Sequence, residues 1–112
     1  MDLETYTNAM SALLERDFDE PGLITKALVH RVDEAILEIV KDGLPFPDDF
    51  YVSTWNSYMN LDWDDLRLRT EIVFSEKRGL VFNINFSFTD EDPAFNLPQQ
   101  KIVGILWDWI KP

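Results

Sequence analysis

The chain has no cysteine among its 112 residues and only one histidine, His30. Without cysteine there is no disulfide bond, no thiolate nucleophile and no cysteine-based metal site. A lone histidine, with neither a second metal ligand nor a nucleophile near it, is typical of a structural or solvated side chain. The sequence therefore offers no basis for cysteine- or histidine-dependent catalysis.

Glycine is also scarce, with four residues spread along the chain. No glycine-rich phosphate loop and no G-x-S-x-G turn occurs. The sequence holds no apolar run of the length that a membrane span needs and no signal-peptide pattern at its start. These observations argue against an enzyme and favour the cytoplasm as the default location.

Basic residues are few, because 10 lysine and arginine side chains stand against 21 aspartates and glutamates, for a net charge of −11. A field of this sign repels nucleic-acid phosphates and anionic membrane surfaces, and it attracts basic proteins. The alternative is that the charge serves only solubility. Hydrophobic residues make up 46% of the chain, which is enough for the core of a single domain over residues 1–112.

Two segments, residues 66–75 and 80–89, alternate between apolar and polar side chains. This two-residue period predicts a β-hairpin with one buried face. Because opposed residues must share a face, we expect a three-residue loop of Lys77, Arg78 and Gly79, with Gly79 in the left-handed conformation. The predicted pairs are Glu76 with Leu80, Phe74 with Phe82 and Ile72 with Ile84. Burial should be almost complete at Ile72, Phe82 and Ile84.

Residues 51–61 alternate more loosely and predict one strand before this hairpin. A four-residue loop at 62–65 would pair Leu61 with Leu66, Met59 with Leu68 and Trp55 with Ile72. In the resulting meander, strands 51–61 and 80–88 are both edges, and the second carries no charge and no proline. We predict that these edges are covered by a helix or loop, or are paired across a homodimer.

Helices are predicted over residues 2–16 and 21–42, where apolar side chains recur at helical spacing. Asp2 can cap the first of them, and Pro21 suits the first turn of the second. Gly43 then provides a stop signal for the second helix. Phe46, in the short segment that follows, should plug the end of the core.

Residues 98–110 fit a helix better than a strand, because a strand would place Asp108 on the same face as Ile102 and Leu106. The segment Asn96–Gln99 resembles a capping box at the start of that helix. The strand alternative stays open, because β-branched residues and Gly104 disfavour a helix. On the helical reading, one wide apolar face includes Trp107 and Trp109.

The expected order is helix, helix, strand, strand, strand, helix. One sheet face needs cover, and three amphipathic helices are available to provide it. The predicted fold class is therefore α+β, a two-layer domain in which helices pack on one face of a three-stranded antiparallel meander.

Acidic residues gather in the loops, which raises the question of metal binding or acid–base chemistry. Asn60, Asp62, Asp64 and Glu71 match positions 1, 3, 5 and 12 of a calcium loop, but Asp65 stands where that loop needs glycine. The carboxylate pairs elsewhere lie in loops that lack the apolar shelter which acid–base catalysis requires. We therefore expect no metal, no cofactor and no catalytic residue.

Trp63 lies inside one of these acidic turns, where a large ring has little core to enter. Exposed tryptophan among carboxylates is typical of a binding anchor surrounded by steering charges. The alternative is that Trp63 folds back onto the end of the sheet. The expected meander brings two acidic turns to that end, so the predicted partner-binding residues are Asp62, Trp63, Asp64, Asp65, Asp90, Glu91 and Asp92.

These features favour a small acidic binding protein that neutralises a basic protein partner. Immunity proteins and antitoxin-like inhibitors of a cationic toxin or nuclease have this profile of size and charge, and so does a phage-type mimic of DNA charge. The alternative from another class is a dimeric secretion or assembly chaperone that uses an apolar surface. Salt dependence separates the two classes, because a contact made by charge weakens steeply with salt.

Overall fold

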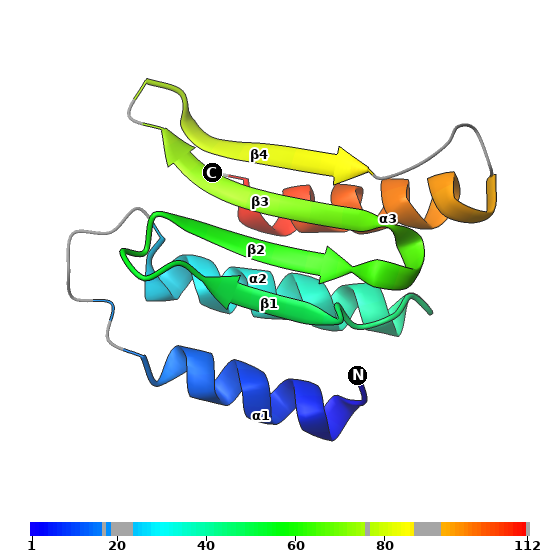
Figure 1. Cartoon of the computed structure of the whole chain (residues 1–112), viewed down its shortest axis with the longest axis horizontal. Coiled ribbons are helices and arrows are strands. Elements are labelled where there is room, and N and C mark those ends of the chain that lie inside the picture. The colour runs from blue at the N-terminus through cyan, green and yellow to red at the C-terminus, as the bar shows by residue number, and fades with distance from the viewer. Residues whose placement is uncertain (17, 19–23, 76, 87–92, 112) are drawn as a thin grey trace.

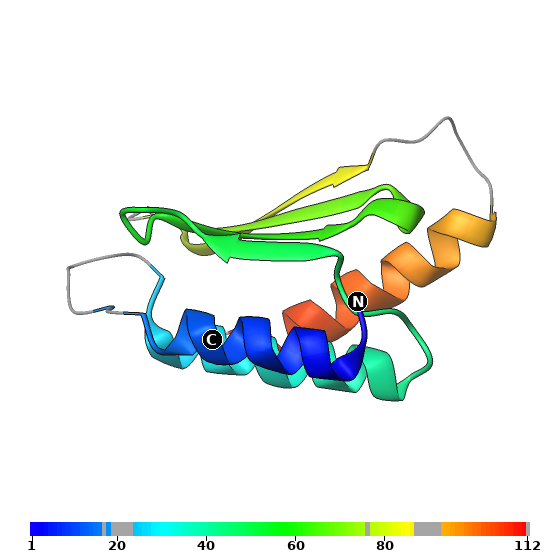
Figure 2. The same ribbon diagram turned by 60° about the horizontal axis from the view of Figure 1, so that its bottom comes forward.

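The computed structural model describes residues 1–16, 18, 24–75, 77–86 and 93–111. Its elements, in chain order, are α1 (Leu3–Leu14), α2 (Lys26–Lys41), β1 (Asp49–Val52), β2 (Tyr58–Trp63), the 3-10 helix η1 (Asp64–Leu66), β3 (Leu68–Ser75), β4 (Gly79–Phe86) and α3 (Pro93–Ile110). The strands form one antiparallel sheet in the order β1-β2-β3-β4. The three helices lie on one face of this sheet (Figures 1 and 2). The α+β class is confirmed, with four strands in place of the expected three.

The first two helices are defined by their caps. The Asp2 side chain accepts a hydrogen bond from the Thr5 backbone nitrogen at 2.8 Å and lies at the start of α1, as predicted. The second helix begins at Lys26, later than predicted, because the Thr25 side chain caps it by accepting from the Leu28 nitrogen at 3.1 Å. The role expected for Pro21 falls outside the described residues.

The prediction of one strand over residues 51–61 is wrong, because the chain reverses in the middle of that segment. β1 ends at Val52 and β2 begins at Tyr58, and Val52 pairs with Met59. Between them the chain turns through Asn56, whose φ of 54° is left-handed. The strand therefore becomes a hairpin, and β2 lies inside the sheet, not at its edge.

The predicted pairing of this segment with β3 is also wrong. The observed partners are Met59 with Ile72, Leu61 with Thr70 and Trp63 with Leu68. β2 runs two residues further than expected because Trp63 continues the buried alternation of Met59 and Leu61. The connection to β3 is made by η1 and by Arg67, which is left-handed with a φ of 52°.

The hairpin of β3 and β4 is confirmed, but its register is shifted from the expected one. Ser75 pairs with Gly79, and Ile72 pairs with Phe82 instead of Ile84. A shift of two residues leaves each side chain on its original face, so the apolar pattern fits both registers equally well. Gly79 does adopt the left-handed conformation, with a φ of 73°. Ile72 is fully buried as predicted, whereas the side chains of Phe82 and Ile84 lie outside the described part of the chain.

Residues 98–110 are helical as predicted, but α3 already begins at Pro93, so the expected cap at Asn96 is wrong and Pro98 lies inside the helix. Its buried stripe is narrower than expected. Ile102, Leu106 and Ile110 are buried, while Trp107 and Trp109 are 42% and 39% exposed. Lys101 joins α3 to the end of α2 through an ion pair with Asp42 at 3.0 Å.

The core lies between the sheet and the helices. Its fully buried members come mainly from α2, β2, β3 and α3, with Tyr6 added from α1, and they include Val32, Ile36, Ile39, Met59, Leu61, Ile72, Ile102 and Leu106. Phe46 closes one end of this core as expected, because its ring stacks on the buried ring of Tyr6 with centroids 4.7 Å apart. The Tyr6 hydroxyl donates a hydrogen bond of 2.5 Å to Asp33, which joins α1 to α2.

Candidate functional site

The predicted contact residues 62–65 lie where β2 passes into η1, at one end of the sheet (Figure 1). Trp63 is only 1% exposed, and its indole nitrogen donates a hydrogen bond of 2.9 Å to the Pro45 carbonyl oxygen. The prediction of an exposed anchor at Trp63 is therefore wrong, and the alternative, in which the ring folds onto the end of the sheet, is correct. The physical reason is that Trp63 points to the same side of the sheet as Met59 and Leu61.

Asp62 is also largely enclosed, with 8% of its surface exposed. Its carboxylate accepts a hydrogen bond from the Arg69 guanidinium at 2.8 Å across the β2–β3 pair. That hydrogen bond raises the pKa of Arg69. The charge of Asp62 is thus already paired with an exposed arginine of the same chain, so Asp62 is a weaker contact for an incoming partner than an unpaired carboxylate.

Asp64 and Asp65 differ from Asp62 because both are exposed in η1. A third carboxylate joins them from the connection between α2 and β1, since Asp48 accepts a hydrogen bond of 2.7 Å from the Asp64 backbone nitrogen. This hydrogen bond ties the two segments together at the end of the sheet. Sequence reasoning missed Asp48 as a site residue, because it is distant in the chain and its only local signal was a turn-rich segment.

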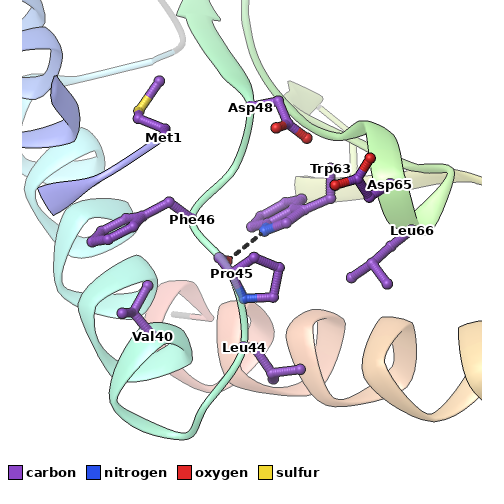
Figure 3. Close-up of a pocket in the computed structure, with 9 residues that line it drawn as sticks. All are labelled: Met1, Val40, Leu44, Pro45, Phe46, Asp48, Trp63, Asp65 and Leu66. Atoms are coloured by element: carbon purple, nitrogen blue, oxygen red, sulfur yellow. Dashed lines mark hydrogen bonds between the residues drawn. The ribbon is translucent and has the colours of Figure 1, made fainter.

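A small pocket opens beside these carboxylates. Its volume is about 240 Å³, and its lining is Met1, Val40, Leu44, Pro45, Phe46, Asp48, Trp63, Asp65 and Leu66. Figure 3 shows the carboxylates of Asp48 and Asp65 next to the Trp63 ring, with Leu66 beyond them and the 44–46 segment on the other side. We call this feature the acidic pocket. It combines apolar side chains with two carboxylates, and its exposed lining is polar and apolar in similar measure.

The size and chemistry of the acidic pocket limit what it can hold. Pockets for drug-sized ligands occupy about 300–1,000 Å³, so this one suits a single side chain or a similar small group. Arginine and lysine bury an aliphatic stem and keep a cationic head at a polar rim. Carboxylates at the rim are the natural partners of such a head, because a charged hydrogen bond is shorter and stronger than a neutral one.

The second predicted acidic turn, Asp90, Glu91 and Asp92, lies outside the described residues. β4 ends at Phe86, which pairs with Leu68 just after η1, so the chain leaves β4 at the same end of the sheet as the acidic pocket. α3 is joined to that end as well, because the Gln99 side-chain nitrogen donates to the Leu66 carbonyl oxygen.

The most exposed tryptophan of this protein is Trp55, which the sequence analysis assigned to a strand. It is 82% exposed and lies in the turn between β1 and β2, at the end of the sheet opposite the acidic pocket (Figure 1). A local signal for this turn is Asn56, a residue that tolerates the left-handed conformation, among the polar residues Ser53, Thr54 and Ser57.

The turn that carries Trp55 is held from both sides. The Arg16 guanidinium donates to the carbonyl oxygens of Val52, Ser53 and Thr54 at 2.7, 2.6 and 3.0 Å. The Ser53 hydroxyl accepts from the Ser57 and Tyr58 nitrogens at 2.9 and 3.2 Å. These hydrogen bonds hold the backbone of the turn, so a contact made through Trp55 would cost little backbone conformational entropy.

Within the described part of the chain, no helix is long and apolar enough to cross a membrane. Among the same residues, no group of three or more histidine, aspartate or glutamate side chains is arranged to hold a metal ion. Comparison with known proteins found no matching family model, no matching curated protein and no matching solved structure.

Proposed function

We propose that this protein binds and neutralises a basic protein partner, in the manner of an immunity protein or an antitoxin-like inhibitor. The observation that supports it best is the acidic pocket, in which Asp48 and Asp65 lie beside an apolar wall that includes Trp63 and Leu66. An arginine or lysine of the partner would enter this pocket. Its stem would pack against the wall, and its charge would meet the two carboxylates.

The net charge of −11 supports the same proposal over a longer range. A field of this size accelerates the approach of a cationic partner and holds it near the acidic end while it docks. Asp64 adds a further exposed carboxylate next to the pocket. Asp62 contributes less, since its carboxylate is already paired with Arg69 across β2 and β3.

The proposal can be tested with a small mimic of an arginine side chain. Titration of isotopically labelled protein with n-butylguanidinium chloride at constant ionic strength should shift the indole N–H signal of Trp63 and the amide signal of Leu66. The neutral analogue n-butylurea should produce no such shift. Asp65→Asn should weaken the response, whereas Glu34→Gln, which removes one exposed charge from α2, should leave it unchanged. Equal shifts with the urea, or none at Trp63, would contradict the proposal.

A second function is favoured by Trp55. A secretion or assembly chaperone binds through an apolar surface, and the Trp55 ring, 82% exposed on a held turn, offers one apolar contact of that kind. The two functions use opposite ends of the sheet, so single substitutions separate them. Loss of partner binding in Trp55→Ala, with retention in Asp65→Asn and little effect of salt, would favour the chaperone.

A further inference from the structure

The outer edge of β4 is the part of the sheet that the described elements leave uncovered. β4 is the last strand in the sheet order and pairs with β3 on one side only. Figures 1 and 2 show it as the outermost strand of its layer, with no described helix or strand beyond it. An unpaired edge presents a row of backbone N–H and C=O groups to another strand.

The two edges of this sheet differ in their protection. β1 is only four residues long and begins with an exposed aspartate, Asp49. β4 is eight residues long, and the segment Gly79–Phe86 contains no charged residue and no proline. Short length, charge and proline are the devices that keep edges apart, so β4 has none of the three.

We propose that β4 pairs antiparallel with β4 of a second copy of this chain, which makes a continuous eight-stranded sheet across a two-fold axis. A two-fold contact is self-complementary, so each residue meets the same surface on the other copy. Strand addition of this kind is carried by backbone hydrogen bonds, and it requires only that the side chains along the edge do not repel one another.

The pleat restricts the register of this pairing. Residues of one face must meet residues of the same face, so paired numbers must add to an even value. The two symmetric registers closest to full overlap place either Asn83 or Phe82 opposite itself. In both of them the exposed Asn83 lies at the axis or next to it, within reach of its counterpart.

Charge complementarity favours a second copy, even though each copy carries a net charge of −11. The turn before β4 holds Lys77 and Arg78, both exposed, at one end of the sheet. Asp64 and Asp65 lie at the other end, because Phe86 pairs with Leu68. An antiparallel pair brings the basic turn of each copy towards the acidic end of the other, two to three strand spacings, or roughly 10–15 Å, away. That separation is longer than the Debye length of about 8 Å at physiological salt, so this attraction adds to the backbone pairing mainly at low ionic strength.

The test uses charge swapping at Asn83, with mass measured by sedimentation velocity. Wild-type protein should sediment at twice the monomer mass of 13.1 kDa. Asn83→Glu and Asn83→Lys should each sediment as monomers with an unchanged circular dichroism spectrum, because like charges then face each other. An equimolar mixture of the two variants should regain the dimer mass, since opposite charges then meet.

Asn8 supplies the matched control, because it is an exposed asparagine on α1, far from β4 in Figure 1. Asn8→Glu and Asn8→Lys should keep the dimer mass. A wild-type protein of monomer mass would overturn the proposal. So would dimers in both Asn83 variants, or a mixture that stays monomeric.

Discussion

The indole nitrogen of Trp63 and the carbonyl oxygen of Pro45 are joined by a hydrogen bond of 2.9 Å. This contact fastens the connection between α2 and β1 onto the end of the sheet, where it forms one wall of the acidic pocket. A buried indole N–H needs such a partner, because leaving it unpaired costs about 1–3 kcal/mol. Trp63 thus holds the wall of the acidic pocket in place. In the proposed function, the carboxylates of Asp48 and Asp65 beside it contact the cationic side chain of the partner.

The two tryptophans Trp63 and Trp55 should respond to truncation in opposite ways. Trp63→Ala should lower the free energy of unfolding by about 3–5 kcal/mol, because it removes a buried ring and leaves a cavity. Trp55→Ala should change it by no more than about 0.5 kcal/mol, as expected for an exposed side chain. Urea unfolding followed by circular dichroism measures both. Similar losses in the two variants would mean that the burial assigned to these rings is wrong.

Arg16 should determine the order of the turn that carries Trp55. Arg16→Lys keeps the charge but loses the planar guanidinium that reaches the carbonyl oxygens of Val52, Ser53 and Thr54. We expect a loss of about 1–3 kcal/mol in stability and lower backbone order parameters at Thr54 and Trp55. Arg31→Lys, at an exposed position on α2, is the control and should alter neither quantity. Unchanged order parameters in Arg16→Lys would show that Ser53 alone holds the turn.

Tyr6 should make stability fall at high pH. Burial, together with the hydrogen bond to Asp33, raises the pKa of the Tyr6 hydroxyl. The folded protein therefore keeps this proton at pH values where the unfolded chain loses it. The stabilisation is fully present below pH of about 10 and declines above it by up to about 1.4 kcal/mol per pH unit. The difference in unfolding free energy between wild type and Tyr6→Phe should shrink as pH rises from 9 to 11, and a constant difference would contradict this.

The sequence predicted those features that depend on short-range pattern. The helical stripes of α1 and α2, the cap at Asp2 and the alternating faces of β3 and β4 follow from residue spacing alone. Ile72 was placed in the core for the same reason. The register of β3 and β4 was not predicted correctly, because a shift of two residues keeps every side chain on the same face of the sheet.

The features that the sequence could not predict are held by contacts between distant residues. The turn after Val52 contains no glycine or proline, and it is fixed by Arg16 from α1 and by the hydrogen bond of 2.8 Å from the Ile24 nitrogen to the Asn56 carbonyl oxygen. Trp63 was misjudged because its partner, Pro45, is 18 positions away. The candidate site changed accordingly, since Asp48 was added and Trp63 moved from the contact surface to its support.

The proposal that a basic partner binds at the acidic pocket is tested most directly by the rate of association with a basic partner captured from the native host. This rate is measured over a range of salt concentrations. The rate constant of the wild-type protein should fall by about ten-fold or more between low and high salt, as electrostatic steering is screened. The double variant Asp64→Asn, Asp65→Asn should associate more slowly and depend less on salt, while Trp55→Ala should associate like the wild type. A salt-independent rate, or a rate that the double variant leaves unchanged and Trp55→Ala reduces, would contradict binding at the acidic pocket.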